Sequence, residues 1–358
     1  MVQAEELERI RLAWPDVGAE ELAAVAAVLE TGMLTMGPLV AEFERELAAA
    51  CETRHAFAVS SGTAALHLAV VALGLEPGDE VLVPAYTFPA TANVVALSGL
   101  KPVLVDVDPV TMNIDPGKVE VRPRTKALLA VHLFGRPARL EELPSLPLVE
   151  DAAGALGARH RGAACGSLGL MACLSFHPRK IVTTGEGGAV TTDDEGVAAA
   201  VAEFRNHGWR SLANADMPAP GLNYRLSDIL CAVGLPQIRR LDELLAARTR
   251  LAAGYSERLA HLPVTLPRAD EGDIHGWQAY VIQVENRDEV LAALRAQGIE
   301  GQIGTFALQL LEAYRDQGPF PGAEHAFRTA LALPFHTRLT DSELDRVAAA
   351  LDKLVSHH

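Results

Sequence analysis

Cysteine, aromatic residues and positive charge are all scarce in this sequence. Its four cysteines, Cys51, Cys165, Cys173 and Cys231, show no CxxC spacing, so buried free thiols in a reducing cytoplasm are favoured over metal ligands or disulfides. Lysine and arginine number 31 against 46 aspartate and glutamate residues, a net charge of −15. This balance argues against a nucleic-acid partner bound through a generally basic surface.

Long apolar runs are absent as well, although 49% of the 358 residues are apolar. No run approaches the roughly 20 residues that span a bilayer. The N-terminal segment MVQAEELERIRLAW carries mixed charges and lacks the apolar core of an export signal. We therefore expect a cytoplasmic, globular protein with a substantial core and no membrane segment.

Short β-branched runs alternate with helical stretches between about residues 55 and 195. This alternation predicts an α/β fold with a mostly parallel, buried central sheet flanked by helices. Beyond about residue 226, long amphipathic helices precede an α+β segment whose last helix Thr340 should cap. We predict a large domain at 1–235, with an N-terminal helical segment, and a small C-terminal α+β domain at 236–358.

The strongest candidate for chemistry is a lysine that follows an apolar strand. The segment SFHPRKIVTTGEGG (175–188) leaves the strand, reaches Lys180 and enters a glycine-rich loop. Taken alone, this residue is more simply a solvated surface lysine. At the carboxyl end of a strand, where such sheets bind ligands, burial and the neighbouring Arg179 would lower the pKa of the amine, as a Schiff-base lysine requires.

An acidic pair ends another predicted strand. Glu150 and Asp151 close the run LPLVED and precede the small residues AAGALGA, which would let a flat ligand approach the backbone. A carboxylate in such a place can accept a hydrogen bond from a protonated pyridine nitrogen. Capping of a helix is the simpler interpretation.

A polar turn and an aromatic residue follow two further strands. Ser61, Gly62 and Thr63 lie between the run AFAVS and a helical stretch, where backbone N–H groups and hydroxyls can receive a phosphate. Phe88, in PAYTFPAT, could stack on a flat ring. Ordinary core packing is the simpler interpretation of this aromatic residue.

In their order along the chain, these motifs resemble the DegT/DnrJ/EryC1/StrS family of sugar aminotransferases, which are fold-type-I pyridoxal 5'-phosphate (PLP) enzymes. The resemblance runs from AWPDVGAEELAAV through SSGTAALHLAV, EDAAGALGA and SFHPRKIVTTGEGGAV to GLNYRLSDILCAVGLPQIRRLD. It implies that Lys180 forms the internal aldimine with PLP and that Asp151 binds the pyridine nitrogen. We expect these two residues to be catalytic.

The same resemblance implies further cofactor contacts. Ser175, together with Gly62 and Thr63, would hold the phosphate, and Phe88 would stack on the ring. Asn223, in GLNYRLSD, would reach the phosphate from a neighbouring subunit, which implies a homodimer with shared active sites.

One position departs from the family's pattern. Three residues beyond the pyridine-binding aspartate, the family usually has a glutamine or histidine near the O3′ oxygen of the cofactor, and Gly154 stands there in this sequence. A missing donor could change the pKa of the Schiff base, or leave space for water or for another side chain.

The reaction implied by the resemblance is a ping-pong transamination in amino sugar biosynthesis. Glutamate or glutamine would convert PLP to pyridoxamine phosphate (PMP), which would aminate a nucleotide-linked keto-deoxysugar while Lys180 moves the proton. An anionic nucleotide needs a locally cationic cleft in a protein of this charge. Structural salt bridges would explain the candidates for that cleft equally well: Arg205, His207, Arg225 and Arg338.

Three alternatives stay open at this point. Some relatives in the family are sugar dehydratases with a histidine in place of the lysine, and Lys180 argues against that reaction. A regulatory protein that binds PLP or a sugar nucleotide without turnover is kept open by Gly154. A nucleotide-binding fold of the Rossmann kind is disfavoured because no GxGxxG opens a first strand–helix unit.

Overall fold

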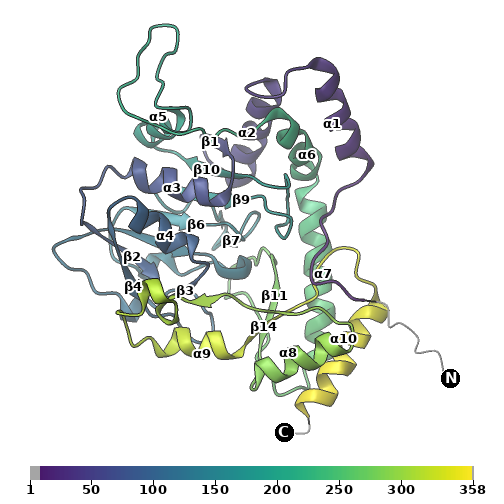
Figure 1. Cartoon of the computed structure of the whole chain (residues 1–358). Helices are drawn as coiled ribbons and strands as arrows, with labels where there is room; N and C mark the ends of the chain where they lie inside the picture. Colours follow the sequence, from purple (N-terminus) through teal and green to yellow (C-terminus); the bar gives the residue numbers. More distant parts are fainter. Residues whose placement is uncertain (1–8, 357–358) are drawn as a thin grey trace.

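A seven-stranded sheet forms the centre of the larger part of the molecule (Figure 1). The structure, a computed structural model, describes residues 9–356. In order across the sheet, the strands are β1 (His55–Val59), β10 (Gly188–Thr192), β9 (Met171–Ser175), β6 (Leu148–Asp151), β5 (Thr125–Val131), β2 (Glu80–Pro84) and β4 (Lys101–Val105). Strand β10 is antiparallel to β1 and β9, and the other pairings are parallel. The predicted α/β class with a mostly parallel sheet is therefore confirmed.

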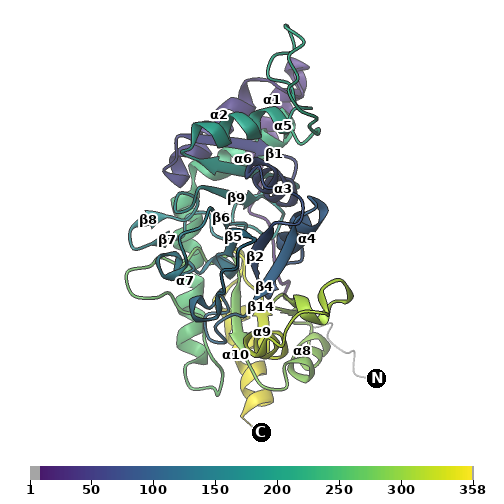
Figure 2. The ribbon, with the colours of Figure 1, turned by 90° about the vertical axis from the view of Figure 1, so that its left-hand side faces the viewer.

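Both faces of this sheet are covered. On β9, Cys173 packs into the core on one face and Leu174 into the core on the other, because successive strand residues point to opposite sides. The helices of this part are α1 (Ala19–Thr31), α2 (Pro38–Cys51), α3 (Gly62–Ala72), α4 (Ala90–Leu97), α5 (Glu195–Phe204), α6 (Asp228–Arg239) and α7 (Leu241–Leu259). Figure 2 shows α3 and α4 on one side of the sheet and α7 on the opposite side.

A smaller part of the molecule has its own core. It contains β11 (Tyr280–Gln283), α8 (Arg287–Ala296), β12 (Gln302–Ile303), α9 (Pro321–Thr329), β14 (Ala330–Leu333) and α10 (Asp341–Val355). The strands form an antiparallel sheet in the order β11-β14-β12. Helix α7 joins the two cores, since Leu244 packs in the larger and Tyr255 in the smaller. The domain division at 235/236 stays a prediction.

Two short antiparallel strand pairs and a helix cap complete the architecture. Strand β13 (Phe306–Ala307) of the C-terminal part pairs with β3 (Tyr86–Thr87), and β7 (Arg159–His160) pairs with β8 (Ala163–Ala164). Thr340 caps α10, as predicted: its Oγ1 accepts a hydrogen bond from the Glu343 N–H at 3.2 Å. Among the helices in residues 9–356, none combines the length and apolar character needed to cross a membrane.

Helix α2 begins without a capping side chain of its own. Its N-cap residue is Gly37, and the buried carboxylate of Asp228, at the start of α6, takes over the role. Asp228 accepts hydrogen bonds from the Gly37 N–H at 2.7 Å and from the Leu39 N–H at 3.1 Å. A Cβ atom at position 37 would lie 2.6 Å from the Asp228 carboxylate, so glycine is required there by space.

We predict that Asp228→Ala lowers the free energy of unfolding by about 2 kcal/mol, because two backbone N–H groups at the start of α2 lose a charged acceptor. Urea denaturation followed by circular dichroism measures the change. Asp242→Ala, in the exposed first turn of α7, is the control and should change stability by less than about 0.5 kcal/mol. Equal stabilities of the Asp228 variant and the control would contradict the assigned role.

Candidate active site

A cavity of about 470 Å³ opens at the carboxyl ends of the parallel strands. It collects residues that follow β1, β5, β6 and β9, as expected for a sheet of this kind. All but one of the predicted site residues line it: Ser61, Gly62, Thr63, Phe88, Asp151, Ser175 and Lys180. A larger cavity of about 750 Å³ lies along the edge strand β4 and contains none of them.

Lys180 is carried by the loop that connects β9 to β10. Its backbone N–H donates to the His177 carbonyl at 2.8 Å, and the Thr184 N–H closes the loop onto the Phe176 carbonyl at 3.0 Å. Burial lowers the pKa of the Lys180 amine, and Arg179 lowers it further, while Asp151 opposes both effects. This lysine is half-buried, so it is not the solvated surface residue that the sequence alone would suggest.

Asp151 ends β6 with only 5% of its surface exposed. The Thr91 hydroxyl donates to its Oδ2 at 2.8 Å, and the Ala153 N–H lies 3.2 Å from Oδ1. Burial raises the pKa of this carboxyl, against the two hydrogen bonds and the Lys180 charge, which lower it. The helix-cap interpretation is wrong, because turns rather than a helix follow the strand.

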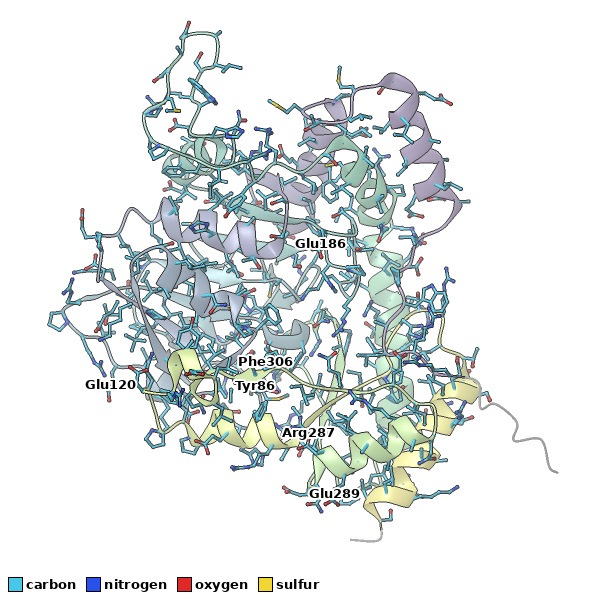
Figure 3. All side chains as sticks on the ribbon, viewed as in Figure 1. Tyr86, Glu120, Glu186, Arg287, Glu289 and Phe306 are labelled. Atoms are coloured by element: carbon cyan, nitrogen blue, oxygen red, sulfur yellow. The ribbon has the colours of Figure 1, made fainter. Side chains whose placement is uncertain are left out.

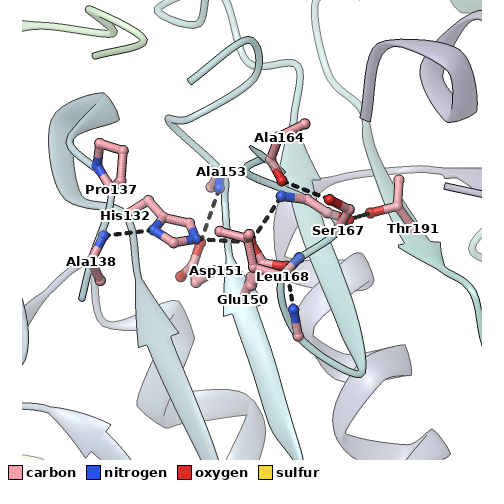
Figure 4. A network of polar contacts seen from close by, with 12 residues as sticks. His132, Pro137, Ala138, Glu150, Asp151, Ala153, Ala164, Ser167, Leu168 and Thr191 are labelled. Atoms are coloured by element: carbon pink, nitrogen blue, oxygen red, sulfur yellow. Dashed lines mark hydrogen bonds and ion pairs between the residues drawn. The ribbon is translucent and has the colours of Figure 1, made fainter. Parts of the chain in front are cut away.

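The neighbouring Glu150 points away from Asp151 and anchors the end of β6 (Figure 4). Its fully buried carboxylate accepts three backbone hydrogen bonds, from the N–H groups of Gly166, Leu168 and Gly169, at 2.6–2.8 Å. His132 Nε2 lies 2.9 Å from the same carboxylate. Because the Nδ1 of His132 accepts from the Ala138 N–H at 2.9 Å, Nε2 carries the proton and donates.

This network was missed in the sequence, where His132 stands inside the run VHLFG. The only local signal is a polar residue directly after an apolar strand. The carboxylate of Glu150 and both ring nitrogens of His132 have hydrogen-bond partners, and these bonds stiffen the strand end that carries Asp151.

The start of α3 meets the β9–β10 hairpin at very short distance. A Cβ atom on Gly62 would lie 2.8 Å from the Ser175 Cβ, and one on Gly188 would lie 2.5 Å from the Ser61 carbonyl oxygen. Ser61 caps α3 by accepting from the Ala64 N–H at 3.0 Å, which leaves its hydroxyl hydrogen free to donate. The arrangement presents a helix N-terminus and the hydroxyls of Ser61, Thr63 and Ser175 to the cavity, a favourable site for a phosphate group.

Phe88 is not core filler. It is 62% exposed and lies edge to face with Phe306 of β13, with 6.3 Å between the ring centroids. Figure 3 shows Phe306 next to Tyr86, where the C-terminal part of the chain reaches the larger sheet. Phe88 therefore presents an aromatic surface to the cavity instead of packing inside the protein.

Asn223 does not line the cavity. It is exposed, and its backbone pairs with Asn206 in the segment that follows α5. The four cationic candidates for a nucleotide cleft do not line the cavity either. Arg205 pairs with Glu44, as the salt-bridge interpretation expected, and Arg225 donates to the Asn206 side chain.

Arg338 lies over the ring of Trp14, at 4.9 Å from its centroid, and His207 is exposed. The cationic groups that do line the cavity are Lys180 and its neighbour Arg179, with His177 and His132 beside them. Arg179 forms no ion pair with an acidic side chain of residues 9–356.

Comparisons with known proteins agree on one family. The sequence profile of the DegT/DnrJ/EryC1/StrS aminotransferase family matches residues 15–352. GDP-perosamine synthase from Caulobacter vibrioides is 39% identical over 368 residues, which cover 98% of this chain and 99% of that protein.

Solved structures give the same result. DesV from S. venezuelae, in complex with a ketimine intermediate, is 37% identical with a TM-score of 0.88 over 94% of each chain. The aminotransferase TlmJ from Streptoalloteichus hindustanus is 32% identical with a TM-score of 0.91, covering 96% of this chain and 99% of that one. The chain therefore belongs to the DegT/DnrJ/EryC1/StrS aminotransferase family, and it is an enzyme that transfers amino groups.

Proposed function

We propose that this enzyme moves an amino group from glutamate or glutamine to a nucleotide-linked keto-deoxysugar, with PLP held by Lys180. The family implies dependence on PLP. The observation that carries the proposal is the cavity that holds Lys180 and Asp151 together, with pKa values displaced in opposite directions by burial.

The cavity residues fit this cofactor. The Lys180 amine would bond to it covalently, Asp151 would accept the hydrogen bond of a protonated ring nitrogen, and Phe88 would cover the ring. Ser61, Gly62, Thr63 and Ser175 would hold the phosphate at the start of α3, where a Cβ atom at position 62 would collide with Ser175. When bound, PLP supplies an electron-withdrawing ring that carries the amino group between the two substrates.

The protein's own part in the chemistry is proton transfer. A general base must be unprotonated near working pH, and burial of Lys180 favours the neutral amine. After taking a proton, Nζ can return it at a neighbouring atom, because the loop from His177 to Thr184 leaves the side chain inside the cavity. Asp151, by contrast, acts in its charged form. Burial disfavours this charge, and a cationic partner such as a ring N–H stabilises it.

The proposed acceptor follows from the name of the relative GDP-perosamine synthase. A nucleotide carries phosphate charges, and a protein of net charge −15 must attract them locally. Arg179 supplies an exposed guanidinium at the cavity, and no acidic side chain in the described part of the chain pairs with it. A sugar dehydratase is disfavoured by Lys180, and turnover with glutamate distinguishes an aminotransferase from a protein that only binds PLP.

The test uses the purified protein loaded with PLP. L-glutamate should convert the bound cofactor to PMP, and a panel of nucleotide-linked keto-sugars should then return it to PLP and yield an aminated sugar. Conversion by glutamate without any aminated product would remove the sugar acceptor from the proposal. No conversion by glutamate or glutamine would support a binder without turnover.

We also propose a homodimer in which Asn223 serves the partner's site. Helix α1, the loop after it and the long loop after α5 lie at the top of Figure 1, and each of these segments carries exposed apolar side chains. They include Leu22, Met33, Met36, Leu212 and Met217. Such a surface is typical of an interface, and a two-fold axis would complete two sites at once.

We predict that Lys180 is the residue that binds PLP covalently. Borohydride reduction should fix PLP on the peptide that contains Lys180, and Lys180→Ala should abolish this adduct. Transamination should fall by about 10²- to 10⁴-fold, the usual contribution of a general acid–base group. Lys353→Ala, on an exposed face of α10, should behave as the wild type. Mass spectrometry showing the adduct on another lysine would contradict the assignment.

Two substitutions should move the pKa of Lys180 in opposite directions. Asp151→Asn removes the charge that raises this pKa, so the amine should lose its proton at lower pH. Arg179→Gln removes a charge that lowers it, so the proton should be lost at higher pH. The rate of acetylation of Lys180 against pH, in the PLP-free protein, measures both midpoints. Midpoints that move the same way would disprove the electrostatic account.

Mixing two inactive variants tests the shared site. Lys180→Ala and Asn223→Asp should each be inactive as a homodimer, the second because it sets a negative charge against the phosphate. After co-refolding, about a quarter of the wild-type activity should return, since half of randomly paired dimers are mixed and each has one intact site. Recovery of no activity from a mixture that does form mixed dimers would refute the contribution of Asn223.

A further inference from the structure

A strained segment runs along the cavity just before β11. Trp277 has a φ of 47°, the left-handed backbone region that bulky side chains rarely adopt. Its ring stacks on His275 with 4.0 Å between centroids. Strain of this kind persists only where the surroundings impose it, and it gathers at functional sites. The next residue, Gln278, lines the cavity.

The surroundings fix this segment from two sides. The Gln278 N–H donates to the Phe134 carbonyl at 3.1 Å. The Arg248 guanidinium, itself only 6% exposed, donates to the Trp277 carbonyl at 3.0 Å and lies 3.3 Å from the Gln278 carbonyl. Residue 278 is therefore anchored through both of its peptide groups, which fixes the direction of its side chain.

The Gln278 side chain lies in the space that Gly154 leaves. A Cβ atom built on Gly154 would come to 3.4 Å from both Cγ and Oε1 of Gln278. The backbone at Gly154 is not left-handed, so its conformation does not demand glycine. The side-chain amide of Gln278 thus occupies the part of the cavity that a side chain at position 154 would otherwise approach.

The same amide reaches the loop of the reactive lysine. Gln278 Nε2 lies 3.4 Å from the Arg179 carbonyl oxygen, one residue before Lys180. The Arg179 guanidinium donates to the side chain of Gln302, at β12. Two glutamines from the C-terminal part of the chain therefore contact the residue next to Lys180.

We propose that Gln278 is a positioning residue for Lys180, whose amide takes the place left by Gly154 and holds the Arg179–Lys180 segment across the cavity. The inference rests on the proposed role of Lys180 as the residue that binds PLP. It gives the strain at Trp277 a function, which is to direct one side chain. It also gives a structural reason for the departure at position 154.

The experiment transfers the glutamine from one side of the cavity to the other. Gln278→Ala should weaken PLP binding by about threefold to tenfold and shift the acetylation midpoint of Lys180 to higher pH, because the loosened loop admits water. Gly154→Gln alone should also weaken binding, since two amides would compete for one space. The double variant, Gly154→Gln with Gln278→Ala, should bind PLP better than either single variant.

Gln297→Ala, at the end of α8, is the matched control and should change neither PLP affinity nor the midpoint. Additive losses in the double variant, or a Gln278→Ala protein with wild-type PLP affinity and midpoint, would overturn the inference while leaving PLP on Lys180. A wild-type protein that carries no PLP on Lys180 would instead overturn the proposed function and this inference with it.

Discussion

The burial of an amine and a carboxylate in one cavity is the constraint on which the rest of this site depends. Removal from water disfavours the charge on each group, while their mutual attraction favours both charges. Lys180 is thereby brought toward the neutral form and Asp151 toward the protonated form. A flat cofactor can satisfy both residues: one of its groups bonds to the neutral amine of Lys180, and its ring N–H donates to the carboxylate of Asp151.

Such a balance requires a scaffold that holds the two groups in place. The carboxylate of Glu150, with three backbone donors and His132, anchors the strand end beside Asp151. The close contact between α3 and the β9–β10 hairpin fixes the loop of Lys180 from the other side. Contacts between well-packed, fully bonded elements limit the positions that a functional side chain can take.

Much of this site could be predicted because its signals are local in sequence. Asp151 and Ser175 end apolar strands, while Lys180 and the Ser61–Thr63 turn follow such strands. Parallel strands place their carboxyl ends at one edge of the sheet, where these residues meet. Core packing was the wrong interpretation of Phe88. The sequence does not show whether an apolar residue that follows a strand faces the protein core or a cavity.

Contacts between distant parts of the chain could not be predicted. Asp228 caps a helix that begins at Pro38, and Gln278 takes the space at Gly154. Neither pair has a sequence signal, because each depends on how two packed elements meet. Arg205 looked like a cation for a nucleotide, but it pairs with Glu44 on α2. Asn223 lies outside the cavity of its own chain, so the role that the resemblance implies for it requires a second copy of the chain and stays a prediction.

A crystal structure of the protein grown with PLP would test the central claim most directly. We expect continuous density from Lys180 Nζ to the cofactor, and a carboxylate oxygen of Asp151 about 2.7–2.9 Å from the ring nitrogen, the distance of a charge-assisted hydrogen bond. PLP bound elsewhere, or a ring nitrogen directed away from Asp151, would contradict the account.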